Sequence, residues 1–124
     1  MNSLGLIELN SIAAGLAVTD AMLKTADVQL VLSRTICSGK YMVIVTGSVA
    51  AVQSSIASGK AEWPDAVIDS MVIPNVHPGV MPAVAGANVV HELGSLGVIE
   101  SFSVASLLER SEEHTSELQS RQVI

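Results

Sequence analysis

The chain contains an internal repeat, which constrains its fold more than any other feature of the sequence. Residues 4–16 read Leu-Gly-Leu-Ile-Glu-Leu-Asn-Ser-Ile-Ala-Ala-Gly-Leu, and residues 96–108 read Leu-Gly-Val-Ile-Glu-Ser-Phe-Ser-Val-Ala-Ser-Leu-Leu. The distance between the copies is too long for a solenoid repeat and is about the size of a small domain. The sequence therefore predicts one domain followed by the start of a second copy. A duplicated domain is typical of proteins that build symmetric assemblies, because two copies in one chain replace two subunits of a ring.

We divide the chain into a first domain at residues 1–90, a linker with the truncated start of a second domain at 91–109, and a tail at 110–124. The composition changes abruptly after Glu109, and no apolar period runs through the tail. Back-translated, its first part is similar to a common sequencing adapter. We therefore interpret the tail as non-native and leave it out of the fold. The alternative is a short, solvated helical tail, and in neither case do we assign it any chemistry.

The composition excludes several classes of partner. Hydrophobic residues make up 49% of the chain and aromatic residues only 2%, which predicts a core of small aliphatic side chains and extensive subunit contacts. The net charge of −6 argues against a nucleic-acid partner. We expect no membrane partner and no signal peptide, because no apolar run reaches membrane-spanning length. The single cysteine excludes a disulfide within the chain and fits the reducing cytoplasm.

The hydrophobic pattern predicts the order strand, helix, strand, strand, helix, strand and short helix. The strands are expected at residues 4–9, 28–33, 41–46 and 67–73, and the helices at 12–26, 48–59 and 78–87. Asn10 or Ser11 caps the first helix, Ser48 caps the second and Gly59 ends it. On the first helix we interpret one face as the core side, namely Ile12, Leu16, Thr19, Leu23 and Ala26. This order predicts an α+β fold of the ferredoxin-like βαββαβ type, with an antiparallel sheet and helices on one side.

Four motifs resemble the bacterial microcompartment shell domain in order and distance. They are Gly5-Leu-Ile-Glu8, Asp20-Ala-Met-Leu-Lys24, Gly47-Ser-Val-Ala-Ala-Val52 and Val72-Ile-Pro-Asn-Val-His77. The resemblance covers residues 3 to about 90, and the restart at Leu96 resembles the tandem-domain, trimer-forming branch of that family. It implies a structural shell protein that self-associates into a trimer or pseudohexamer with a central pore. Its further partners would be other shell proteins, which join it in sheets, and the encapsulated enzymes.

Within that branch, residues 33–40 are similar to the pore segment of the propanediol-utilisation-type members. The resemblance implies a pore loop made of Ile36, Cys37, Ser38, Gly39 and Lys40. It also implies that Cys37 is a metal ligand that binds a [4Fe–4S] cluster shared by three chains, with a fourth ligand that is not protein. Ser38 stands where those members have proline, so the turn is less restrained here.

Three alternatives stay open for this segment. One is a metabolite pore without a cluster. Another is that Cys37 is a small buried apolar residue, as a lone cysteine usually is. Lys40 either offsets the negative charge of a thiolate-bound cluster or is a solvated lysine at the start of a strand.

The resemblance also implies a tile edge made of Lys24, Asp20, Asn75 and His77. Asp20 and Lys24 stand four residues apart on a helix, and Lys24 resembles the family's edge lysine, which packs against its mate in the next tile. As a solvated pair they would stabilise the helix by only about 0.3–0.5 kcal/mol. Asn75 stands where many relatives have arginine. The alternative for His77, which lies between prolines, is a hydrogen-bonding loop residue.

We find no motif that supports catalysis and predict no catalytic residue. The sequence lacks a paired-carboxylate motif, a Ser/His/Asp set with supporting motifs, metal-ligand spacing and a Gly-rich phosphate loop. The first functional hypothesis is therefore a shell tile. The alternative from another class is a small ferredoxin-like regulatory or ligand-binding module.

Overall fold

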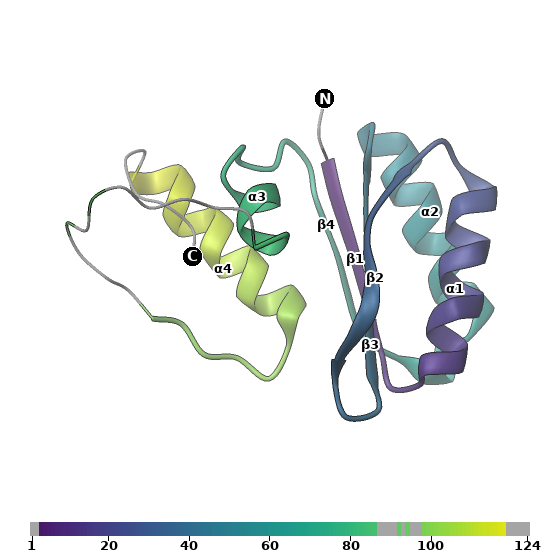
Figure 1. The fold of residues 1–124 in the computed structure, drawn as a ribbon. Helices are drawn as coiled ribbons and strands as arrows, with labels where there is room; N and C mark the ends of the chain where they lie inside the picture. The colour runs from purple at the N-terminus through teal and green to yellow at the C-terminus, as the bar shows by residue number, and fades with distance from the viewer. Residues whose placement is uncertain (1–2, 87–91, 93, 95–97, 119–124) are drawn as a thin grey trace. The chain divides into compact units, whose positions relative to one another are not determined.

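The computed structural model describes residues 3–86, 92, 94 and 98–118, and the chain divides into two compact units, Met1–Asn75 and Val76–Ile124 (Figure 1). The first unit contains every predicted element of the βαββαβ pattern. In chain order these are β1 (Ser3–Leu9), α1 (Ile12–Thr25), β2 (Gln29–Cys37), β3 (Lys40–Gly47), α2 (Val49–Glu62), a 3₁₀ turn (Pro64–Ala66) and β4 (Val67–Ile73).

The four strands form one antiparallel sheet in the order β2-β3-β1-β4. β1 is central, so that Leu6 lies opposite Ile44 of β3 on one side and opposite Met71 of β4 on the other. Both α1 and α2 cover the same face of the sheet (Figure 1). The predicted ferredoxin-like arrangement is confirmed.

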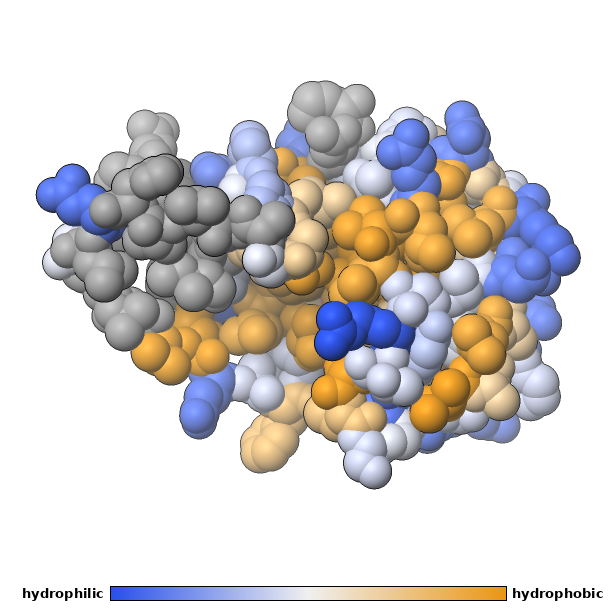
Figure 2. Space-filling model, in the orientation of Figure 1, coloured by the Kyte–Doolittle hydropathy of each residue, from blue (hydrophilic) through white to orange (hydrophobic). Residues whose placement is uncertain are grey.

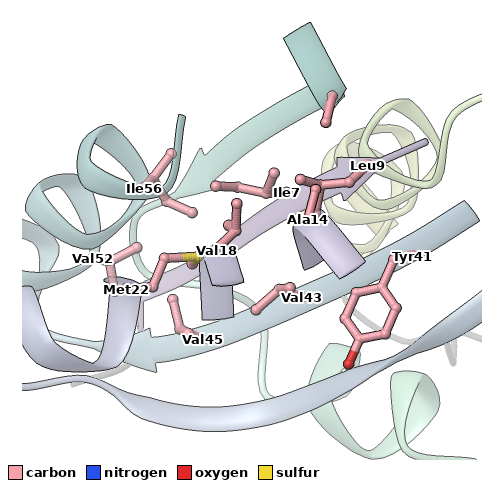
Figure 3. Packing of buried hydrophobic residues seen from close by; sticks show 11 residues of the cluster. Ile7, Leu9, Ala14, Val18, Met22, Tyr41, Val43, Val45, Val52 and Ile56 are labelled. Atoms are coloured by element: carbon pink, nitrogen blue, oxygen red, sulfur yellow. The ribbon is translucent and has the colours of Figure 1, made fainter. Parts of the chain in front are cut away.

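The core of the first unit lies between this face and the two helices (Figure 3). Its members are aliphatic apart from Met22 and Tyr41, and they are Ile7, Leu9, Ala14, Val18, Met22, Tyr41, Val43, Val45, Val52, Ile56 and Ala66. Glycines allow the layers to approach closely. A Cβ at Gly5 would lie 2.7 Å from Val52 Cγ1, and a Cβ at Gly59 would lie 2.7 Å from Ile7 Cδ1.

The predicted core face of α1 is wrong except at Thr19. The buried residues are Ala14, Gly15, Val18, Thr19 and Met22. Ile12, Leu16 and Leu23 are 45%, 59% and 39% exposed. The helix has two apolar faces, and the sheet packs on the one with smaller side chains because these allow a closer approach. In the orientation of Figure 1, the surface of the first unit carries apolar patches between polar ones (Figure 2).

The predicted caps are confirmed, whereas the predicted end of the second helix is wrong, and the third helix ends at Val84 and not at residue 87. Ser11 Oγ accepts the N–H of Ala14 at 3.2 Å, and Ser48 Oγ accepts the N–H of Ala51 at 3.2 Å. α2 does not stop at Gly59 but continues to Glu62. Gly59 is buried there, because a glycine in mid-helix lets the helix pack closely against the sheet. β2 extends four residues beyond the predicted end, since its pairing with β3 continues up to the turn.

The second unit contains two helices, α3 (Val80–Val84) and α4 (Val104–Leu118). α3 lies within the predicted short helix. The start of α4 is capped like the start of α1: Ser103 Oγ accepts the N–H of Ser106 at 3.2 Å, as Ser11 Oγ does for the N–H of Ala14.

The repeat of residues 4–16 implies that the second copy also begins with a strand. In the described part of this stretch, residues 98–103, no strand is formed. In the first copy the matching strand, β1, pairs with β3 and β4, whereas residues 109–118 continue α4 and offer no such partners. α4 runs to Leu118, so residues 110–118 of the predicted tail are helical. Of the predicted linker, the structure describes Glu92 and Gly94, and both are exposed. Residues 96 and 97 lie outside the described residues.

Candidate functional site

The five residues predicted for the pore loop lie together at the tip of the β2–β3 hairpin. Cys37 pairs with Lys40, and Ser38 and Gly39 form a two-residue turn between them. Gly39 has a φ of 77°, which glycine adopts readily. Such a residue at the third position is typical of a type II turn, whose second position favours proline. Ser38 occupies that second position and is not among the residues with positive φ, so serine here keeps the turn that a proline would restrain.

The thiol of Cys37 is accessible at this tip. Cys37 is a free, exposed cysteine, so the alternative of a buried apolar residue is wrong. Ile36 before it is half-buried, and the strand register shifts between Thr35 and Cys37. Within the described part of the chain, no group of three or more His, Cys, Asp or Glu side chains could hold a metal ion.

A row of three hydroxyl groups connects this hairpin to α1. Tyr41 Oη lies 2.6 Å from Ser33 Oγ, and Ser33 Oγ lies 3.1 Å from Thr19 Oγ1. Thr19 Oγ1 in turn donates to the carbonyl of Gly15 at 2.7 Å. No sequence pattern indicates that these three hydroxyl groups lie together. The members of this row come from three elements, and only the polarity of Thr19 on a buried helix face could have signalled it.

The predicted edge pair on α1 is formed in the structure. Lys24 Nζ lies 2.7 Å from Asp20 Oδ2, and the two side chains are 74% and 62% exposed. Such an exposed pair contributes at most about 1 kcal/mol to folding. Both side chains are therefore available for contact with another molecule without much effect on the fold.

The other two predicted edge residues lie in different units. Asn75 ends the first unit, is exposed and has a φ of 53°, a left-handed conformation that asparagine tolerates. His77 belongs to the second unit, where its Nδ1 accepts the N–H of Gly79 at 3.0 Å. Its own N–H donates to both carboxylate oxygens of Glu112, each at 3.0 Å. His77 therefore makes the loop hydrogen bonds of the alternative interpretation, and of the four residues only Asp20 and Lys24 form a described pair with each other.

Comparison with known proteins identifies the family. The family model of the BMC domain, which describes the sequences of that family, matches residues 3–76. The bacterial microcompartment shell protein PduT of Citrobacter freundii is 44% identical over 106 residues, which are 86% of this chain and 58% of PduT. The bacterial microcompartment shell protein PduA of the same organism is 41% identical over 59 residues, which are 48% of this chain and 63% of PduA.

A solved structure agrees with these relatives. The crystal structure of a microcompartments protein from Desulfitobacterium hafniense DCB matches with a TM-score of 0.78 and 41% sequence identity, over 94% of this chain and 64% of that chain. The chain thus spans less than two thirds of the length of these proteins. The matched model covers the whole βαββαβ unit, including the hairpin turn and the Asp20–Lys24 pair. The chain therefore belongs to the BMC-domain family.

Proposed function

We propose that the chain is a structural component of a bacterial microcompartment shell. It assembles into a closed, ring-shaped tile in which the β2–β3 turns surround a central pore. The observation that carries the proposal is the match to a microcompartments protein over 94% of the chain at 41% identity. PduT and PduA, which are both named as shell proteins, support it.

We also propose which partners the protein has and where in the cell it acts. The tile associates with other shell proteins through an edge that includes Asp20 and Lys24, and the resulting sheet encloses enzymes in the cytoplasm. The chain itself performs no catalysis in this role. Among the residues that the structure describes, no helix is both long and apolar enough to cross a membrane.

Sedimentation velocity combined with negative-stain electron microscopy tests this assembly. We expect the purified chain to form closed rings with a central opening, and sheets of rings at high concentration. A monomer or small dimer that forms neither would contradict the tile. Together with binding of a small metabolite, that result would favour the regulatory or ligand-binding module.

The second part of the proposal concerns Cys37. The residue fits a shared cluster because its thiol is exposed at the tip of a turn, where copies from different chains can meet. Lys40 pairs with Cys37 across the turn, so a basic residue and the cysteine occupy the same level of the hairpin. Three Cys37 thiolates would hold a [4Fe–4S] cluster, which supplies one-electron transfer when bound. Support for the cluster comes from this exposure and from the resemblance of the turn.

Anaerobic reconstitution with iron and sulfide tests the cluster. A cluster shared by three chains requires about 1.3 iron atoms per chain, with a broad brown absorbance and a paramagnetic signal on reduction. Cys37→Ser should abolish both while the oligomer survives. Equal iron content in the variant, or colourless wild-type protein that still forms rings, would contradict the cluster and leave a metabolite pore.

A further inference from the structure

The three hydroxyl groups between the hairpin and α1 form a chain with a fixed direction. Each hydroxyl has one proton to donate. Thr19 donates its proton to the carbonyl of Gly15, so Thr19 can only accept in its contact with Ser33. Ser33 therefore donates to Thr19 and has no proton left, so Tyr41 must donate to Ser33. The direction is Tyr41 to Ser33 to Thr19 to the helix backbone, and it starts at the phenolic proton of Tyr41.

The row of hydroxyl groups joins both strands of the hairpin to α1, close to the turn. Ser33 lies four residues before Cys37 on β2, and Tyr41 directly follows Lys40 on β3. Tyr41 pairs with Thr35 in the sheet, so its bond to Ser33 runs diagonally across the two strands. The ring itself is held at one end of the core, with its hydroxyl directed away from the other labelled side chains (Figure 3).

The diagonal bond matters because the ladder is irregular at the turn. The register shifts between Thr35 and Cys37, so backbone pairing alone fixes the turn less firmly than a regular ladder would. β2 is also an edge strand, and among the described strands it pairs with β3 alone. A bond from Tyr41 to Ser33 fixes the relative position of the two strands on the sheet side of this irregularity.

We propose that Tyr41 is a positioning residue for Cys37. Its phenolic proton starts the hydroxyl chain that holds the β2–β3 hairpin on α1 and thereby sets where the thiol lies. The importance of that position for pore and cluster rests on the proposed function, whereas the positioning itself is a property of the single chain.

Because Cys37 is the only cysteine, a nitroxide attached to it reports the mobility of the turn directly. The labelled chain is diluted into an excess of unlabelled chain, so that labels do not interact. Tyr41→Phe keeps the ring and removes the donor, and Ser33→Ala breaks the chain in the middle. The matched control is Ser55→Ala, which removes a buried bond of 3.0 Å from Ser55 Oγ to the carbonyl of Met22, on the helices and away from the hairpin.

We expect Tyr41→Phe and Ser33→Ala to raise label mobility and to speed amide exchange in the turn by about tenfold, since a lost hydrogen bond of this kind changes an opening equilibrium by up to that factor. Ser55→Ala should leave both unchanged at a similar loss of overall stability. Equal mobility in all three variants would overturn the proposal. If Tyr41→Phe fails to fold, the comparison of Ser33→Ala with Ser55→Ala tests the proposal. Iron content is measured separately, so loss of the cluster hypothesis would not affect this result.

Discussion

The backbone of Gly15 in α1 lies directly against the ring of Tyr41 in β3, so closely that a Cβ at residue 15 would overlap the ring. The contact sets the separation between the first helix and the sheet next to the candidate pore turn. In the repeat, Leu107 stands where the first copy has Gly15.

Gly15→Ala should destabilise the first unit, although alanine is the better helix former by about 1 kcal/mol. Overpacking against a held ring costs about 1–3 kcal/mol, which outweighs that gain. Chemical denaturation measures the free energy of unfolding. In a Tyr41→Leu background, which removes the ring, Gly15→Ala should become neutral or stabilising. A stabilising effect in the wild-type background would show that the contact is looser than described.

The two residues of the hairpin turn should respond to substitution in opposite directions. Ser38→Pro should raise the free energy of unfolding by about 0.4–1 kcal/mol, because proline restricts the unfolded chain and suits this turn position. Gly39→Ala should lower it by about 1–2 kcal/mol, because an L-residue is strained at a φ of 77°. Thermal and urea unfolding of the two variants measure both changes in the free energy of unfolding. Destabilisation by proline would mean that the turn differs from type II.

Ser103→Ala should loosen the first turn of α4, since it removes the cap that receives the N–H of Ser106. A lost N-cap costs about 1 kcal/mol, which corresponds to roughly fivefold faster amide exchange in that turn. Ser11→Ala is the matched change in the first copy, where the Ala14 amide should respond. Hydrogen exchange resolved by mass spectrometry separates the two helices. No response at Ser103 would argue against the repeated cap.

Lys24→Ala should leave the domain folded and weaken association between tiles. The pair with Asp20 is exposed, so its loss changes stability by less than about 1 kcal/mol. Circular dichroism checks the fold and electron microscopy checks sheet formation. Lys60→Ala, which removes an exposed lysine from the last turn of α2, serves as the control. Sheets that form equally in both variants would exclude Lys24 from the edge.

The sequence predicted the order and type of the elements well because strand and helix periods were both clear. β4 has the predicted bounds, and the Ser11 and Ser48 caps are formed as expected. The core face of α1 could not be predicted from the size of its apolar residues, since Gly15 and Ala14 face the sheet while Leu16 faces outward. Close approach between layers, not side-chain volume, decided that face.

Those parts of the candidate site whose residues are neighbours in the sequence could be predicted. The hairpin turn and the Asp20–Lys24 pair each come from one short segment. The hydroxyl chain of Thr19, Ser33 and Tyr41 joins three elements, and no local pattern indicates such a contact. The strand that the repeat implies for the second copy is not formed for a related reason, because a strand depends on partners elsewhere in the chain.

Crosslinking through Cys37 tests most directly whether the β2–β3 turns of different chains meet around one axis. A short bismaleimide is added to the assembled protein, and covalent dimers are counted on a denaturing gel. The control places a single cysteine at the exposed position 53 of α2, as Gln53→Cys in a Cys37→Ser background. We expect efficient dimer formation through Cys37 at protein concentrations where the control gives little. Equal yields from both positions, or no dimers through Cys37 in assembled rings, would contradict the pore at this turn.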